Sequence, residues 1–374
     1  MIGRSFRVAT IFGIPIKVDL SWLVIVVLLT ATLAAVFSRD HPSLGWPSWF
    51  LMGLASAMLL FGSVLAHELS HALVALREGI GIRGITLFIF GGAAEMIDEP
   101  PNAKAELKVA VAGPAMSLAL AVGFGSLYSV GLGWFHESVL GVVKYLALMN
   151  AILVAFNLVP GFPLDGGRVL RAVLWGIWGN LRYATRTASV VGSGFGVLIM
   201  LLGLVYVLPF GNLIGGIWYL FIGFFLRNAA RASYQQMLVR DVLQGVKAAD
   251  LMSREVLSVS PDATVEEIVD RVVLPTGMTN LPVLENSRLV GLLGLREIQA
   301  VERSHWSQVR AREIMRRDVL GQVVSPEDDA TRLLSMVVSD DTLIPVMDGE
   351  RLVGIVTRPE LMRRLKLRME LPSA

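Results

Sequence analysis

Hydrophobic residues follow two different patterns along the chain. Up to about residue 245 they form long apolar stretches, each close to the roughly 20 residues that a helix needs to cross a bilayer. Beyond that point apolar and polar residues alternate over short distances, which is typical of the strands and small helices of a soluble domain. We expect six membrane-spanning segments, near 19–37, 49–76, 106–133, 139–160, 186–208 and 211–229.

The distribution of charged residues supports the same division. They occupy 27 of the first 245 positions but 37 of the last 129. We therefore expect a membrane domain over 1–235, a linker over 236–246, and two soluble units over 247–303 and 309–366. No small-residue cleavage site follows the first apolar segment, so we interpret that segment as a retained helix.

The overall composition excludes several classes of function. The net charge is only +2, and the basic residues are not gathered in one patch, so we expect no nucleic-acid partner. The chain contains no cysteine, which excludes disulfides, thiolate metal ligands and a cysteine nucleophile.

Basic residues in the short loops predict the orientation in the membrane. An even number of spans places both termini on one side, and Lys and Arg accumulate in the cytoplasmic loops of membrane proteins. Only Arg39 and Lys144 fall on one side. The basic residues on the other side are Arg4, Arg7, Lys17, Arg77, Arg83, Lys104, Lys108, Arg168, Arg171, Arg182, Arg186, Arg227 and Arg231. We expect a multi-pass protein of the cell membrane with both termini and the soluble units in the cytoplasm.

The second apolar segment contains three ionisable residues in the sequence HELSH. His67 and His71 are four residues apart, so on a helix they share one face and can bind one metal ion, with Glu68 beside it. Ionisable side chains inside a membrane are energetically costly and usually mark a functional site. The alternative is that these polar residues form hydrogen bonds across a helical bundle.

A third metal ligand is expected from the end of the fourth segment, which reads NLVPGFPLDGG. Pro160 and Pro163 interrupt the helix, and such irregular backbone at membrane depth is tolerated only inside protein or beside a water-filled cavity. Asp165 follows on the same side of the membrane as the histidines, and a catalytic zinc ion takes three protein ligands. The alternative makes Asp165 a helix N-cap, with Gly166 and Gly167 as turn residues.

HELSH, the later N-x-x-P-G-x-P-L-D-G motif and the repeated soluble region together resemble the site-2 protease family of intramembrane zinc metalloproteases. The resemblance is to the branch with a C-terminal pair of cystathionine β-synthase (CBS) domains, and it covers the whole chain. It implies one Zn²⁺ ion, Glu68 as the catalytic base, and Asn157 lining the site near the scissile bond. Capping of the backbone freed by Pro160 is the alternative role for Asn157. Many relatives have Asn where Ser117 stands here.

The segment 82–90, IRGITLFIF, predicts a strand, because it is rich in β-branched and aromatic residues and precedes Gly91 and Gly92. We expect its free edge to pair with an unwound segment of a single-span membrane protein substrate. An interfacial hairpin with no substrate role is the alternative. The predicted fold is a polytopic α-helical membrane protein with a small interfacial β-hairpin or sheet, followed by a soluble α/β tandem CBS pair.

The soluble region repeats itself with an offset of 63 residues, as between Pro282 and Pro345. CBS pairs often bind adenine nucleotides through a T/S-x-x-D step, whose counterparts here are Thr357 and Glu360 in the second unit. The first unit has Gly294 and Glu297 instead. The CBS pair is therefore expected either to bind an adenine nucleotide or to be a structural module that forms a homodimer.

The favoured function is an intramembrane zinc metalloprotease that acts in regulated intramembrane proteolysis, with the CBS pair as its regulatory module. One alternative is a CBS-regulated cation transporter or channel that uses the intramembrane His, Glu and Asp residues. Another is a membrane scaffold with a nucleotide-sensing tail. Transporters often contain internal repeats of their spans, and none is evident in the first 245 residues.

Overall fold

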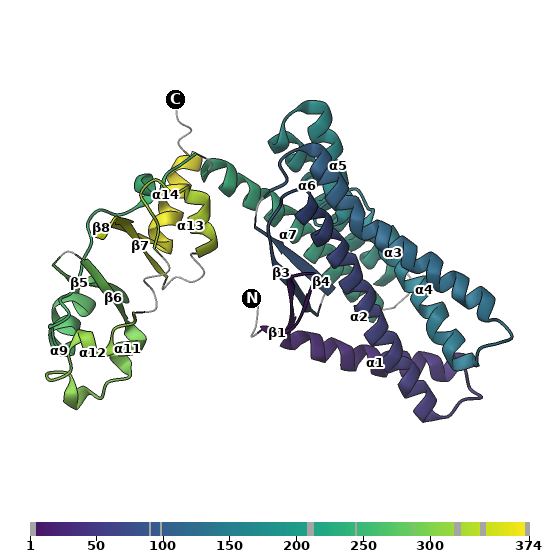
Figure 1. The fold of residues 1–374 in the computed structure, drawn as a ribbon. Helices are drawn as coiled ribbons and strands as arrows, with labels where there is room; N and C mark the ends of the chain where they lie inside the picture. Colours follow the sequence, from purple (N-terminus) through teal and green to yellow (C-terminus); the bar gives the residue numbers. More distant parts are fainter. Residues whose placement is uncertain are drawn as a thin grey trace. The chain divides into compact units, whose positions relative to one another are not determined.

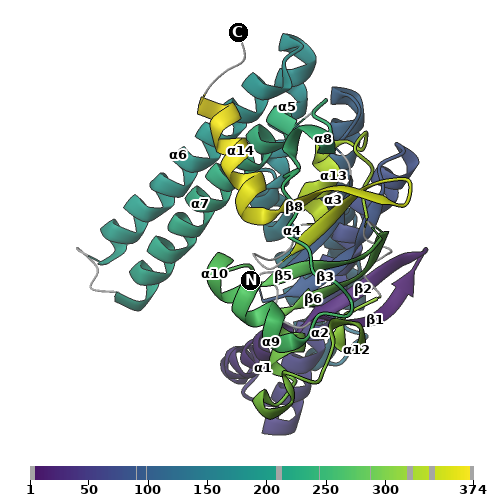
Figure 2. The ribbon, with the colours of Figure 1, turned by 90° about the vertical axis from the view of Figure 1, so that its left-hand side faces the viewer.

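The computed structural model describes residues 5–89, 91–97, 99–207, 213–243, 245–286, 288–317, 323–336 and 342–370. The chain divides into two compact units, Met1–Gln235 and Gln236–Ala374. Most of their helices and strands are labelled in Figure 1, and β2, α8 and α10 are labelled in Figure 2.

The first unit is a helical bundle with a small sheet. Within its described residues, five helices are long and apolar enough to cross a membrane, which confirms a helical membrane domain. They are α1 (Leu20–Asp40), α2 (Trp46–Arg77), α3 (Ala103–Gly131), α4 (Glu137–Asn157) and α6 (Leu181–Val207). The sixth expected span, 211–229, begins outside the described residues and continues in α7 (Leu213–Leu243). A shorter helix, α5 (Asp165–Trp178), joins α4 to α6.

Local side chains explain where several of these helices begin and end. Asp19 accepts a hydrogen bond from the Ser21 amide at the start of α1, and Asn102 accepts one from the Ala105 amide at the start of α3. Gly179 ends α5 in the left-handed conformation, with φ of 64°, which glycine adopts without strain. The spanning helices combine high mean hydropathy with few charged residues, as expected of helices that cross a bilayer.

Four strands form a sheet in the order β1-β2-β3-β4. Their bounds are β1 (Ser5–Ile11), β2 (Ile14–Asp19), β3 (Ile82–Phe88) and β4 (Gly91–Met96). The strand expected at 82–90 is present as β3, but the prediction that it offers a free edge is wrong. An N-terminal hairpin, β1–β2, covers that side because β2 pairs in parallel with β3, while β4 pairs antiparallel on the other side. The strands at the edges of the sheet are β1 and β4.

Glycines allow very close packing around α6. A Cβ on Gly196 would lie 2.7 Å from the carbonyl oxygen of Gly223, and one on Gly203 would lie 2.8 Å from that of Gly216. These contacts explain how α6 and α7 run side by side (Figure 2). Gly192 instead faces the loop between α4 and α5, where a Cβ would collide with the carbonyl oxygen of Phe162.

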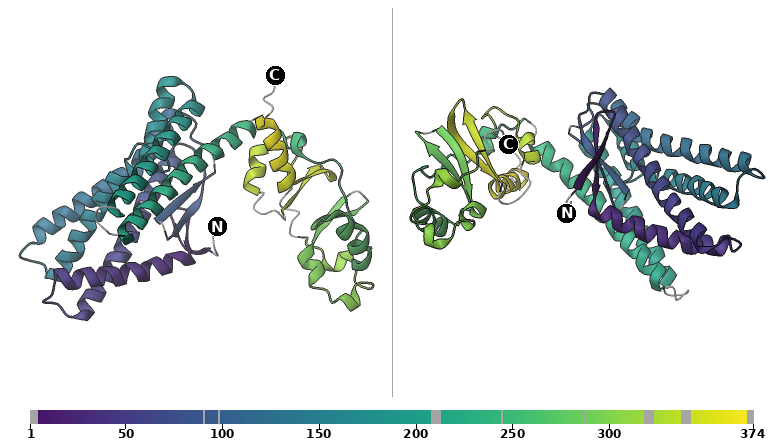
Figure 3. Two further views of the ribbon diagram at one scale, coloured as in Figure 1. Left: turned by 180° about the vertical axis from the view of Figure 1, so that it is seen from behind. Right: turned by 60° about the horizontal axis from the view of Figure 1, so that its bottom comes forward.

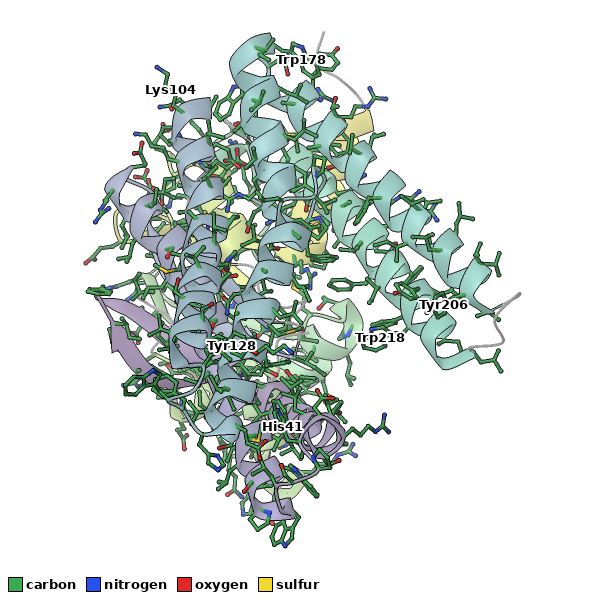
Figure 4. All side chains as sticks on the ribbon, turned by 90° about the vertical axis from the view of Figure 1, so that its right-hand side faces the viewer. His41, Lys104, Tyr128, Trp178, Tyr206 and Trp218 are labelled. Carbon is green, nitrogen blue, oxygen red and sulfur yellow. The ribbon has the colours of Figure 1, made fainter. Side chains whose placement is uncertain are left out.

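The two ends of the helical bundle carry different polar and aromatic side chains. Figure 4 places Lys104 and Trp178 at one end and His41 at the opposite end. The predicted topology likewise places Lys104 and His41 on different sides of the membrane. On α6 and α7, the rings of Tyr206 and Tyr219 lie with their centroids 5.8 Å apart.

The second unit is a mixed α/β domain with one sheet in the order β5-β6-β8-β7 (Figure 3). Its strands are β5 (Asn280–Glu285), β6 (Arg288–Gly294), β7 (Leu343–Asp348) and β8 (Arg351–Thr357). Its helices are α8 (Ala248–Leu251), α9 (Val265–Ile268), α10 (Leu274–Thr276), α11 (Leu295–Gln299), α12 (Ala311–Ile314), α13 (Ala330–Met336) and α14 (Arg358–Glu370), with a π-helical turn at Val269–Val273 and a 3₁₀ turn at Arg303–His305.

The two hairpins of this sheet repeat the same register. Val283 pairs with Gly291 in the first, and Val346 pairs with Gly354 in the second, as the 63-residue offset requires. The hydrophobic cores, however, exchange segments between the repeats. Residues 243–252, which lead into and begin the first repeat, pack with β7, β8 and α14, whereas residues 309–315, which begin the second repeat, pack in the core of the first repeat.

Candidate metal centre

The side chains of His67, His71 and Asp165 converge on one point. The Oδ2 atom of Asp165 lies 3.0 Å from His67 Nε2 and 3.2 Å from His71 Nε2. The two Nε2 atoms are 3.2 Å apart. Both histidines are at least 95% buried within the bundle, since only 5% and 3% of their surfaces are exposed. The structure therefore brings together the three residues that the sequence predicted as metal ligands.

These distances match the requirements of a tetrahedral ion. Ligand atoms at about 2.0–2.1 Å from tetrahedral zinc are separated from one another by about 3.3–3.4 Å. The three observed separations of 3.0, 3.2 and 3.2 Å form a nearly equilateral triangle slightly smaller than one face of that tetrahedron. Two imidazoles and one carboxylate are also a typical donor set for catalytic zinc, which leaves the fourth position open.

Helix α3 orients the imidazole rings of His67 and His71 through contacts with their Nδ1 atoms. His71 Nδ1 lies 2.6 Å from the Val109 carbonyl oxygen, which can only accept, so this nitrogen carries a proton and donates it. His67 Nδ1 lies 2.8 Å from the Ser117 hydroxyl oxygen. The bond to Val109 leaves the Nε2 lone pair of His71 directed at the shared point, as is usual for metal-binding histidines, and His67 does the same when its Nδ1 donates to Ser117. Ser117, whose role was open in the sequence, thus contacts His67 directly.

Gly113 makes room for the converging atoms. A Cβ at this position would lie against both Nε2 atoms, at 2.5 Å from that of His67. Val109, Gly113 and Ser117 follow one another at intervals of four residues and therefore share one face of α3. Sequence reasoning missed the role of this face, although the Gly113-Pro114 pair inside an apolar helix was a visible signal.

Glu68 lies on α2 next to the cluster and contacts strand β4. The Ala94 backbone N–H forms a hydrogen bond with its carboxylate. Gly92 of the same strand packs against the Glu68 side chain, where a Cβ would lie 2.7 Å from Glu68 Cγ. The edge strand β4 thus fixes the direction in which Glu68 can point.

The broken segment after α4 delivers Asp165. Helix α4 ends at Asn157, and α5 begins with Asp165 as its first residue. Leu164 is the N-cap, so the alternative that made Asp165 a helix cap is wrong. Gly166 is also not a simple turn residue, because it lies inside the helix, where a Cβ would collide with carbonyl oxygens of the preceding loop. Asn157 is half-buried at the end of α4.

Of the two candidate nucleotide residues of the CBS pair, Glu360 is already engaged by arginines. Thr357 ends β8, and Glu360 lies in the first turn of α14. Arg363 Nη2 lies 2.7 Å from Glu360 Oε2, and Arg364 Nε lies 2.8 Å from Oε1. These hydrogen bonds, that of Arg363 above all, hold the pKa of the Glu360 carboxyl below its ordinary value. In the first repeat, Glu297 likewise contacts Arg316, at 3.2 Å.

Comparisons with protein-family models agree with this arrangement. The model of peptidase family M50 matches residues 55–135 and 126–202, which include both histidines and Asp165. The CBS domain model matches residues 248–302 and 311–367.

Full-length relatives share both parts of the chain. Zinc metalloprotease MJ0392 of Methanocaldococcus jannaschii is 30% identical over 368 residues, which cover 98% of this chain and 97% of that protein. The protein sll0528 of Synechocystis sp., whose name assigns it provisionally to the zinc metalloproteases, is 33% identical over 374 residues, with 98% and 96% coverage. Among solved structures, the site-2 protease from M. jannaschii is 29% identical and covers 61% of this chain and 95% of its own, with a TM-score of 0.42. The chain therefore belongs to peptidase family M50, as a zinc metalloendopeptidase of the site-2 protease type that carries a C-terminal pair of CBS domains.

Proposed function

We propose that this protein hydrolyses a peptide bond in or near the transmembrane segment of a single-span membrane protein, in regulated intramembrane proteolysis. The observation that carries the proposal is the triangle of His67, His71 and Asp165 donor atoms, with Glu68 beside it. A cation transporter has no need of a base held next to such a site. The names of the full-length relatives also favour proteolysis.

His67, His71 and Asp165 would hold one Zn²⁺ ion. When bound, zinc polarises a carbonyl group and makes a water molecule acidic enough to lose its proton near neutral pH. Glu68 accepts that proton, because its carboxylate is adjacent to the site and is oriented by the Ala94 amide. Glu68 then returns the proton to the leaving amine.

Asn157 is proposed to donate a hydrogen bond to the oxyanion that develops on the scissile carbonyl. A contact of this type is often worth about 3 kcal/mol in the transition state. Its position at the end of α4, shortly before the loop that delivers Asp165, supports this role. The competing role is capping of the backbone near Pro160. Loss of turnover without loss of stability in Asn157→Ala separates the two.

The substrate is proposed to bind as an added strand on the edge of β4. A helical segment hides its peptide bonds, whereas an extended one exposes them to hydrolysis. The earlier expectation placed this edge on β3, which is covered on both sides. β4 is the better partner because it is an edge strand and its Gly92 and Ala94 contact Glu68.

Removal of zinc is expected to abolish cleavage reversibly. The purified chain should contain one zinc ion per molecule, measured by elemental analysis, and should cleave a single-span reporter in detergent or liposomes. Treatment with a chelator should stop cleavage, and Zn²⁺ should restore it. Mg²⁺ should not, because imidazole ligands suit zinc and Mg²⁺ prefers oxygen. Chelator-resistant cleavage would contradict a zinc mechanism.

The protein resides in the membrane, and we propose that both termini and the CBS pair face the cytoplasm. The support is the excess of Lys and Arg in the loops on that side. The membrane-spanning helices and the site then share the bilayer with the substrate.

Adenine nucleotide is the ligand class that we propose for the CBS pair, with Thr357 and Glu360 as contact residues. Binding must displace Arg363 or Arg364 from Glu360, so we expect weak affinity for ATP and AMP. Calorimetric titration of the full chain measures it, and Thr357→Ala should weaken it further. If neither nucleotide binds, a homodimerising role for the module is favoured, which sedimentation would detect.

A further inference from the structure

A fully buried carboxylate on α3 pairs with two arginines of α5. Glu106 Oε1 lies 3.2 Å from Arg168 Nε and 2.6 Å from Arg171 Nη2, and Glu106 itself has no exposed surface. Arg171 also lies over the ring of Phe162, with 5.2 Å between its guanidinium carbon and the ring centroid. This group of side chains, which we call the Glu106 clamp, ties α5 and the loop before it to α3.

The clamp acts on the helix that carries the metal-site carboxylate. Asp165 is the first residue of α5, and Arg168 and Arg171 lie within the next two turns. A shift of α5 along or around its axis would therefore move the Asp165 carboxylate directly. The sequence had placed both arginines only among the basic residues of the predicted cytoplasmic side, whereas in the structure both side chains point to Glu106.

The other end of the clamp lies on the helix face that orients the histidines. Glu106 precedes Val109 by three residues, and this spacing places it on the same face of α3. That face also carries Gly113 and Ser117, which contact the imidazole rings. The ion pairs thus join the helix that supplies Asp165 to the surface against which both histidines are held.

Stability alone is a weak explanation for the clamp. A buried ion pair gains little because removing its charges from water offsets their attraction, and apolar replacements of similar size are often no less stable. Here two guanidinium groups face one carboxylate, so the charges do not even balance within the group. Such hydrogen-bonded pairs instead fix the relative position of the two helices, because a guanidinium group binds a carboxylate oxygen only in restricted geometries.

We propose that Glu106 is a positioning residue. Through Arg168 and Arg171 it holds Asp165 at the distance from His67 and His71 that a shared metal ion requires. The inference rests on the proposed zinc centre and adds to it a residue that does not touch the ion. Weakening the clamp should therefore weaken zinc binding before it unfolds the protein.

The test measures zinc affinity on the full chain in detergent, by competition of the metal-free protein with a chromophoric chelator. Arg168→Gln is the main variant, because it leaves one carboxylate facing one guanidinium group. We expect its zinc affinity to fall roughly 10–100-fold, the usual cost of losing an outer contact of a metal ligand. The visible bands of the Co²⁺-loaded protein should change, whereas thermal unfolding of the metal-free protein should stay close to that of wild type.

Two further variants keep the test decisive. Glu106→Asp retains the charge but is shorter, and it should show an intermediate loss of affinity even if Glu106→Gln fails to fold. Lys108→Gln is the matched control, since it removes another ion pair of α3, the 2.7 Å contact with Glu78, and should bind zinc normally. The proposal is overturned if Arg168→Gln and Glu106→Asp bind zinc as tightly as wild type. Failure of the wild-type chain itself to bind zinc would instead refute the zinc centre.

Discussion

Replacing Glu68 with glutamine is expected to abolish peptide cleavage while leaving zinc bound. Glutamine has nearly the same shape, but its amide cannot accept the proton that a water molecule must lose. General acid–base groups of this kind contribute roughly 10²–10⁴-fold to a rate. Because the metal-binding atoms belong to His67, His71 and Asp165, the zinc content should remain at one ion per chain.

The measurement compares single-span reporter cleavage and zinc content in the same preparations. Glu78→Gln is a suitable control. Glu78 is the C-cap residue of α2, the helix that contains Glu68, but its carboxylate pairs with Lys108. We expect this control to cleave as wild type does. Normal cleavage by Glu68→Gln would remove Glu68 from the reaction, and loss of zinc in that variant would instead make Glu68 a ligand.

The convergence of the candidate metal ligands was predictable because most of its signals are local in the sequence. Helical geometry fixes the i, i+4 relation of His67 and His71, and the rarity of ionisable residues inside apolar segments marks them as a site. Asp165 needed one further step, the count of membrane crossings that returns it to the same side. The structure places its Oδ2 within 3.2 Å of both imidazoles.

The residues around the site were not predictable in the same way, because they act across helices. Ser117 and Glu106 look like ordinary residues of an apolar helix until α2 and α5 are placed against α3. The free edge was wrongly assigned to β3 for a similar reason. The enrichment of residues 82–90 in β-branched and aromatic side chains predicts a strand but carries no information about the β1–β2 hairpin, whose strand β2 pairs with β3.

In the soluble region, too, the sequence predicted the local elements but not the contacts between them. Sequence repetition predicted two equivalent hairpins, and their registers match at Gly291 and Gly354. It did not predict that the segment at the start of each repeat packs against the other repeat. Met252 contacts Gly354, and Met315 contacts Gly291, although each methionine lies in the opposite sequence repeat. Exchange of this kind is a property of packing, which a repeat pattern cannot reveal.

Helix α3 packs against the two imidazoles at Gly113, where even one methyl group has no room. A Cβ there would lie against the Nε2 atoms of His67 and His71, the two atoms that must bind the ion. Neither imidazole can retreat freely, because its Nδ1 is held by Ser117 or by the Val109 carbonyl. The methyl group would therefore occupy the space of the ion or push the helices apart.

Gly113→Ala is accordingly expected to lose zinc and to reduce cleavage by roughly 100-fold or more, since a misplacement of about 1 Å in an active site can cost that much. Gly123→Ala on the same helix is the matched control, because a Cβ there meets nothing within 4 Å. That control should bind zinc and cleave normally, and alanine should if anything favour the helix by roughly 1 kcal/mol. Zinc content, reporter cleavage and thermal unfolding measured on both variants decide the matter. Normal zinc binding by Gly113→Ala would mean that the histidines do not meet at this face of α3, and the proposed site would have to be placed elsewhere.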